Sequence, residues 1–159
     1  MTQSTVDTVR APPLCVELDG VVILSNSLYE SLLALLLARP WFLLLLPLWM
    51  LGGRAQMRHK IAQAGLLDAG KLPYRRELVA FLEEQKGRGR TLVLATAADE
   101  KIAKTVASHL GLFSGIVASD REHDMQGRQM AAALVQLYGS RGFDYLGNSL
   151  ADIPVWAEA

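Results

Sequence analysis

The chain has 159 residues, is 51% hydrophobic, and carries sixteen basic and sixteen acidic side chains, so its formal net charge is zero. This length and apolar content suit one compact domain with a buried core. A balanced charge argues against a nucleic-acid partner, which needs a basic surface. Cys15 is the only cysteine, which excludes an internal disulfide and indicates a reducing, cytoplasmic location. Because Cys15 lies in an apolar run, we expect it in the core.

Residues 1–12 form a polar segment that ends in "APP". They contain no apolar stretch of the kind that a secretory signal needs. We therefore expect a disordered lead-in over 1–12 and a single domain over 13–159.

The first apolar run, "LCVELDGVVILS" over 14–25, contains two acids spaced i, i+2. Burying two carboxylates at a strand end is costly unless something uses them. Glu17 and Asp19 are therefore a working catalytic pair, the remnant of one, or a solvated strand end.

A leucine-rich segment over 31–53 approaches the length of a membrane-spanning helix. Arg39-Pro40 predicts a break in its middle, which leaves each half too short to span. One interpretation is a pair of buried helices that form a small cap. The other is a hairpin that contacts a membrane surface or an embedded partner, with Trp41 and Trp49 near the interface.

Four basic residues follow this segment directly, and such clusters occur beside anionic lipid. They are Arg54, Arg58, His59 and Lys60. If the hairpin contacts lipid, we expect the chain at the cytoplasmic face of the membrane.

After this segment, helical and strand patterns alternate to the end of the chain. Helices are predicted over 74–86, from Asp99 as N-cap to about 110, and over 128–138, and strands over 91–95, 115–119 and 143–146. This alternation predicts an α/β fold with a mostly parallel sheet flanked by helices.

Polar residues follow three of the predicted strands. Glu17 and Asp19 follow the first, Thr96 follows the second, and Asn148 and Asp152 follow the last. Ligands of open parallel sheets bind beyond the carboxyl ends of the strands. These side chains are therefore expected to share a site, although a turn and a helix cap would also explain Asn148 and Asp152.

The pattern resembles the haloacid dehalogenase (HAD) superfamily of phosphatases. The motifs are "CVELDGVV", "LVLATAA" and "GNSLAD", and the resemblance runs from Pro13 to Trp156. The text is most similar to the HAD-like domain fused to UbiA-type membrane prenyltransferases. The resemblance implies a Rossmannoid core over 13–24 and 73–159, a leucine-rich cap over about 25–72, and a truncated C-terminal part.

The resemblance also implies roles for individual residues. Glu17 takes the position of the nucleophile and Asp19 that of the acid and base. Thr96, Ala97 and Gly20 correspond to phosphate-binding positions. A Mg²⁺ ion would be held by Glu17, Asp19, Asn148 and Asp152, whose oxygens suit it.

The catalytic motifs are degenerate at several positions. Glu17 is one methylene longer than the usual aspartate, and a displacement of 1 Å costs roughly a hundredfold in rate. Val21 replaces the usual threonine, and Met130 stands at the position of the phosphate-binding lysine. Lys101 and Lys104 lie on another predicted helix.

Three functional hypotheses follow from these residues. In the first, the chain is a HAD-like domain with weak or absent phosphatase activity that binds a phosphorylated small molecule and regulates or scaffolds a UbiA-type prenyltransferase. In the second, it is an active phosphatase acting on a small or polyprenyl-linked phosphomonoester. In the third, it is a peripheral membrane module whose functional element is the leucine-rich hairpin.

Overall fold

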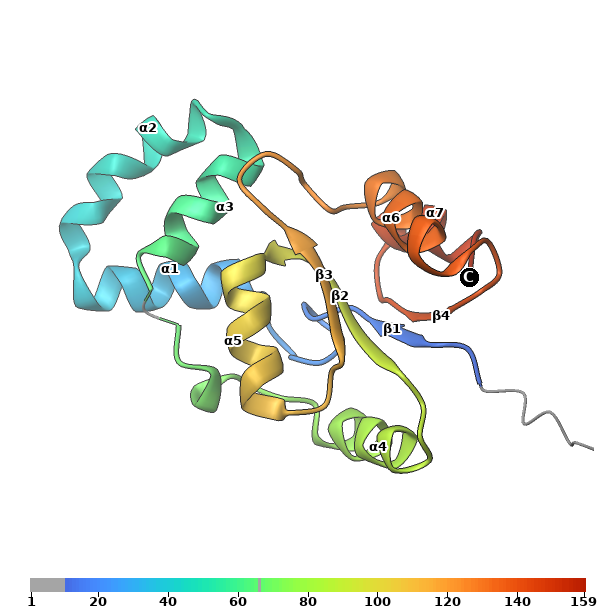
Figure 1. Ribbon diagram of the computed structural model, residues 1–159. Helices are drawn as coiled ribbons and strands as arrows, with labels where there is room; N and C mark the ends of the chain where they lie inside the picture. Colours follow the sequence, from blue (N-terminus) through green and yellow to red (C-terminus); the bar gives the residue numbers. More distant parts are fainter. Residues whose placement is uncertain (1–10, 66) are drawn as a thin grey trace, which may run out of the picture.

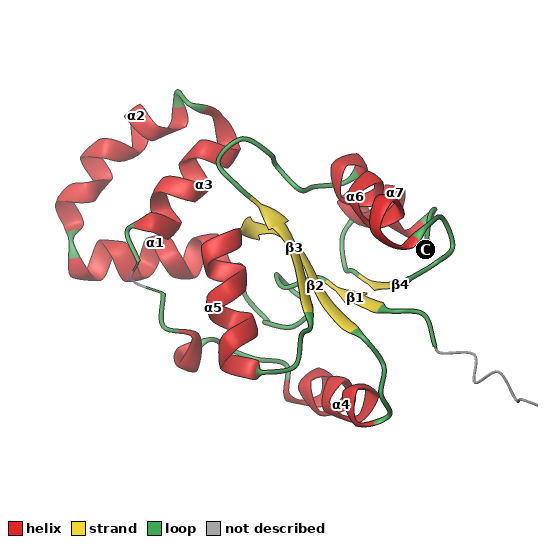
Figure 2. Cartoon of the chain, viewed as in Figure 1, coloured by secondary structure: helices red, strands yellow, loops and turns green. Residues whose placement is uncertain are grey.

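Four short strands form one parallel sheet in the order β3-β2-β1-β4 (Figures 1 and 2). The strands are β1 (Leu14–Val16), β2 (Leu92–Asp99), β3 (Gly115–Ser119) and β4 (Asp144–Leu146). The structure is a computed structural model that describes residues 11–65 and 67–159. Most of the lead-in predicted over 1–12 therefore lies outside the described residues.

The helices alternate with these strands after a helical insertion that follows β1. The insertion contains α1 (Ser27–Ala38), the 3₁₀ turn η1 (Pro40–Leu45), α2 (Leu46–Met50), α3 (Gly53–Gln63) and the turn η2 (Ala69–Lys71). The remaining helices are α4 (Arg76–Gly87), α5 (Glu100–Leu110), α6 (Arg128–Tyr138), the turn η3 (Leu150–Asp152) and α7 (Ile153–Trp156).

The sheet is buried on both faces, as the nearly continuous apolar runs of its strands predict. One face packs against α4 and α5 through side chains such as Leu82 and Val106, and the other packs against α6 and α7 through Leu134 and Val155. Cys15 is fully buried on the second face, and burial raises the pKa of its thiol to about 12. The predicted α/β fold with a parallel sheet flanked by helices is confirmed.

The second strand is longer than the predicted 91–95, because β2 continues beside β3 to Asp99. Thr96 therefore lies inside the strand rather than at its end. The prediction for the next helix holds at both ends. Asp99 accepts a hydrogen bond from the amide of Lys101 at 3.0 Å, and the helix ends at Gly111, which has a φ of +63°.

The helices α1 to α3 form a separate lobe, which we call the cap (Figure 1). The chain enters and leaves it through two neighbouring segments, where Ile23 forms an antiparallel bridge with Tyr74. The break predicted at Arg39 is present, because α1 ends at Ala38 and a 3₁₀ turn begins at Pro40. In the described part of the chain, no helix is long and apolar enough to cross a membrane.

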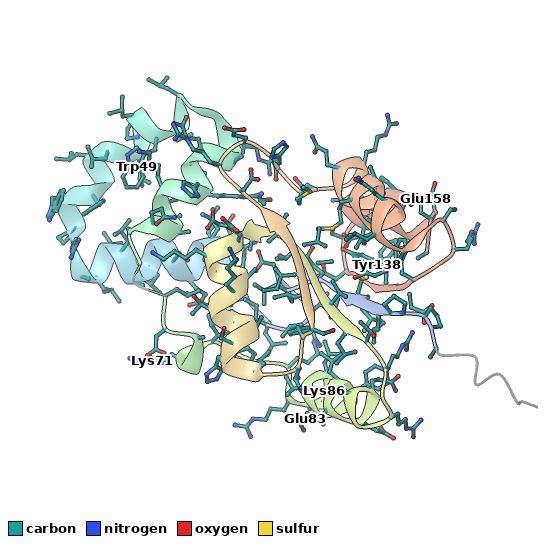
Figure 3. The ribbon with its side chains drawn as sticks, viewed as in Figure 1. Trp49, Lys71, Glu83, Lys86, Tyr138 and Glu158 are labelled. Carbon is teal, nitrogen blue, oxygen red and sulfur yellow. The ribbon has the colours of Figure 1, made fainter. Side chains whose placement is uncertain are left out.

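The cap exposes most of its apolar side chains. The face of α1 that is buried contains only Ser27, Ser31 and Leu35. Trp49 lies on α2 (Figure 3), and its ring is 5.7 Å from that of Phe42. Large exposed side chains along α1, η1 and α2 are Leu33, Leu36, Leu37, Trp41, Leu44, Leu48, Met50 and Leu51. The leucines are therefore a surface feature rather than the interior of a buried helical pair.

Two of the four basic residues after the leucine-rich segment face the core rather than a free surface. Arg58 donates to the carbonyl oxygen of Ala97 at 3.1 Å, and the Nδ1 atom of His59 lies 2.9 Å from Asp99 Oδ2. The prediction of one basic cluster beside lipid does not describe these two side chains. Helical geometry explains the split, because residues four and five positions apart lie on different faces.

Candidate active site

A cavity of about 340 Å³ opens where the ends of β1, β2 and β4 meet the cap. The order of the sheet reverses between β1 and β4, which is where open parallel sheets bind ligands. Six of the seven predicted site residues line this cavity: Glu17, Asp19, Gly20, Ala97, Asn148 and Asp152. Thr96 is fully buried behind them and does not line it.

Glu17 follows β1 directly, and its carboxylate turns back onto its own chain. Its Oε1 atom accepts hydrogen bonds from the amides of Leu18 at 2.9 Å and Asp19 at 3.4 Å. Burial raises the pKa of Glu17 from 4.5 to about 7, while the hydrogen bond with Thr96 lowers it. A carboxylate with this pKa and these partners is only partly ionised at neutral pH, which makes it a weak nucleophile.

Asp19 connects the core to the first helix of the cap. Its Oδ1 accepts from the amide of Ser27 at 2.8 Å, and its Oδ2 accepts from the Ser27 hydroxyl at 3.1 Å. Burial raises the pKa of Asp19, whereas Ser27 and the charge of Arg58 lower it. Both carboxylate oxygens therefore already have donors from the protein.

Asp152 organises the loop that follows β4. Its Oδ1 accepts from the hydroxyl of Tyr145 at 3.1 Å, and its Oδ2 accepts from the amides of Asn148 and Ser149 and from the Ser149 hydroxyl at 2.9–3.1 Å. This is a capping box at the start of η3. The alternative that the sequence left open, a turn and a helix cap, therefore describes what Asp152 contacts.

Asn148 and Gly20 bring the loops after β4 and β1 into contact. Gly20 has a φ of +74°, and a Cβ atom at this position would lie 2.0 Å from Asn148 Nδ2. Any larger residue would strain the backbone and displace the Asn148 side chain. The two motifs "LDG" and "GNS" therefore form one wall of the cavity, as the strand-end argument predicts.

Thr96 serves the strand end rather than the cavity. Its Oγ1 accepts from the amide of Ala98 at 3.1 Å, and it also forms a hydrogen bond with Glu17. Its predicted role in phosphate binding stays a prediction. Ala97 does reach the cavity, so the backbone after Thr96 borders the space where a ligand would bind.

Met130 also lines the cavity, as expected for the position that lysine holds in the resembling family. Its thioether donates no hydrogen bond and carries no charge. The lysines on α5 are engaged elsewhere: Lys101 donates to the carbonyl oxygen of Gln63 and Lys104 pairs with Glu100. The core therefore offers no cation to the cavity among its described residues.

The cap supplies that missing charge through Arg58, a role that the sequence did not indicate. Arg58 lines the cavity, and its Nη1 donates to Asp124 Oδ1 at 2.9 Å as well as to Ala97. Ser25 and Asn26, between β1 and α1, line the same side. No local pattern pointed to these residues, because Arg58 is 39 positions from Ala97 and 66 from Asp124.

The carboxylates have few oxygen lone pairs left for a metal ion. A hard cation such as Mg²⁺ needs oxygen ligands that are free to coordinate, but Asp19 and Asp152 accept hydrogen bonds on every carboxylate oxygen. Over 11–65 and 67–159, no three His, Cys, Asp or Glu side chains are grouped to hold a metal. The arrangement does not fit Mg²⁺ as it stands, and the predicted site stays a prediction.

Known structures share this architecture. A HAD-superfamily hydrolase of subfamily IA from Geobacter sulfurreducens superimposes with a TM-score of 0.58 and 14% identity, over 94% of this chain and 86% of that one. A phosphoserine phosphatase with an analogue of its phospho-aspartyl intermediate gives 0.59 and 11%, over 94% and 84%. These likenesses show the HAD-like fold.

The sequence comparison adds one longer relative. The uncharacterized protein y4nM of Sinorhizobium fredii is 34% identical over 151 residues, which cover 94% of this chain. The chain spans only 29% of the length of that relative. No family model matches the chain.

Proposed function

We propose that this HAD-like domain binds a phosphomonoester with weak or no hydrolytic turnover. The observation that carries the proposal is the state of Glu17 beside an open cavity. Its carboxylate is held by backbone amides and by Thr96, and its pKa is raised to about 7. In-line attack on phosphorus needs an ionised oxygen aimed at the substrate.

The remaining cavity suits binding better than chemistry. Its volume of about 340 Å³ is in the range of small-molecule pockets. Donor groups of Arg58, Asn26 and Ser25 border one side of it. Guanidinium groups and hydroxyls are typical partners of phosphate oxygens, which supports a phosphorylated small molecule as the ligand.

Hydrolysis of p-nitrophenyl phosphate, measured with and without MgCl₂, tests the weak turnover. We expect the rate with the wild-type protein to stay near the uncatalysed background. A clear rate that disappears in Asp19→Ala would contradict the proposal and favour the active phosphatase.

A double variant, Glu17→Asp with Met130→Lys, tests whether these two positions limit turnover. The shorter acid leaves room for an in-line attack, and the lysine adds a donor to the α6 side of the cavity. We expect turnover to rise above that of the wild type. If it does not, the alignment of this site with the HAD motifs is wrong.

The domain is proposed to act within a longer protein and to regulate or scaffold a membrane prenyltransferase. Support comes from the resemblance to the domain fused to UbiA-type enzymes and from the 29% coverage of the longer relative. Co-purification of the full-length protein, followed by a prenyltransferase assay with and without this domain, tests the link. Unchanged prenyl transfer would argue against a regulatory role.

A second candidate function is contact with a membrane surface through the cap. The exposed apolar side chains on α1, η1 and α2 favour it, since isolated domains rarely expose so many together. Co-sedimentation with anionic vesicles is expected to fall in a Leu44→Asp/Leu48→Asp variant. Failure of the wild type to bind vesicles would remove this candidate.

A further inference from the structure

The cavity has two chemically different walls. The wall formed by the core contains Glu17, Asp19 and Asp152, all acidic, together with the apolar Met130. The wall formed by the cap contains Arg58, which is the one lysine or arginine side chain that lines the cavity among the described residues. An anion that enters the cavity therefore meets its positive charge on the cap side.

Arg58 is held in place by one nitrogen. Nη1 donates to Ala97 O and to Asp124 Oδ1, and Asp124 lies on the loop between β3 and α6, which passes beside α3 (Figure 1). No residue over 11–65 or 67–159 accepts a hydrogen bond from Nε or Nη2. A guanidinium that is fixed at one end and open at the other is suited to bind two oxygens of one phosphate.

Two further donors on the same wall lack partners. The hydroxyl of Ser25 is buried and forms no hydrogen bond to any described residue. Asn26 uses its Oδ1 to cap α1 through the amide of Leu28 at 3.0 Å, which leaves its Nδ2 as a donor. A buried hydroxyl without a partner costs free energy, so a ligand or water that reaches Ser25 is favoured.

We propose that the cap supplies the phosphate-binding cation of this site, with Arg58, Ser25 and Asn26 forming an anion subsite that takes the place of the lysine absent at Met130. This inference rests on the proposed function and specifies which side chains bind the phosphoryl group. It makes Arg58 a binding residue and Asp124 the residue that positions it.

The experiment is a titration of the protein with inorganic phosphate at low ionic strength, followed by calorimetry or ³¹P NMR. We expect Arg58→Gln to weaken binding by about 10- to 100-fold, because hydrogen bonds to charged groups are each worth about 1.5–3 kcal/mol. We expect Asp124→Asn to weaken it less, since Arg58 stays present but is less firmly positioned. Adding Met130→Lys to Arg58→Gln is expected to restore part of the affinity from the opposite wall.

Two matched controls separate charge and cap docking from direct binding. Arg54→Gln removes an exposed charge one turn earlier on α3, so it is expected to leave the affinity unchanged. His59→Ala removes the other contact between α3 and the core, with Asp99. It is expected to lower the melting temperature without a tenfold loss of phosphate affinity.

The outcomes distinguish the two proposals. If the wild type binds phosphate and Arg58→Gln binds it equally well, this inference is wrong and the proposed function stands. An equal loss in His59→Ala would also overturn it, because docking of the cap would then explain the effect. If the wild type binds no phosphate, the proposed function fails, and the inference with it. Should Arg58→Gln not fold, Arg58→Lys is expected to bind several-fold more weakly, since lysine lacks the fork.

Discussion

On the core wall of the cavity, each carboxylate oxygen of Asp19 and Asp152 accepts a hydrogen bond from the protein itself, whereas on the cap wall Arg58 is fixed through Nη1 alone. Saturated acids of this kind hold loops together and add little to ligand binding. An anchored but open guanidinium does the reverse. Substitutions on the core wall should therefore change stability, and substitutions on the cap wall should change ligand affinity.

Asp152→Ala is expected to give the largest effect on the core wall. It removes the acceptor of four hydrogen bonds, from Tyr145, Asn148 and Ser149. Buried donors left without partners cost about 1–3 kcal/mol each, so we expect a loss on the order of 4 kcal/mol in the free energy of unfolding, measured in urea. Asp152→Asn keeps one acceptor oxygen and should lose less; equal stability of Asp152→Ala and wild type would contradict the comparison.

Glu17→Gln is expected to change how stability depends on pH. Between its ordinary pKa of 4.5 and its raised pKa of about 7, Glu17 keeps a proton in the folded protein that the unfolded chain has released. The free energy of unfolding of the wild type therefore falls as the pH rises through this window, by about 3 kcal/mol. The variant lacks this loss, so its stability relative to wild type should grow from pH 4 to pH 8.

The matched control for that measurement is Glu83→Gln on the outer face of α4 (Figure 3). Glu83 is exposed, and its substitution should leave the pH dependence of the wild type unaltered. A Glu17→Gln protein whose stability follows the wild-type curve at every pH would show that the Glu17 carboxyl is not desolvated.

Ser27→Ala is expected to give the smallest effect, because it removes only one of the two donors to Asp19. The amide of residue 27 still donates to Asp19 Oδ1, while Oδ2 loses its partner. We expect a loss of about 1 kcal/mol in urea unfolding and no change in phosphate affinity. Ser108→Ala, on an exposed position of α5, serves as the control and should stay within about 0.5 kcal/mol.

The strand-end argument placed most of the site correctly because it depends on the parallel sheet alone. Once β1, β2 and β4 lie parallel, the residues after them must meet at one edge, and Glu17, Ala97 and Asn148 do. Thr96 departs from the prediction because β2 pairs with β3 beyond the expected end. The length of a strand depends on its neighbour, which its own residues do not specify.

The leucine-rich segment was harder to interpret from its residues. Arg39-Pro40 fixed the break, since proline restricts the residue before it wherever that residue lies. Whether the leucines face inward or outward depends on what packs against them. Only the folded chain shows that α1 buries Ser27, Ser31 and Leu35 and leaves Leu37 exposed.

The sequence by itself determined the parallel α/β sheet, the edge where a ligand binds and the absence of lysine at position 130. These follow from patterns within single strands and helices, whose geometry is local. Only the tertiary structure decided that Asp152 is fully hydrogen-bonded and that Arg58, which resembled part of a basic surface cluster, lines the cavity. Contacts across 39 and 66 residues are set by how the cap docks on the sheet, and no local pattern encodes them.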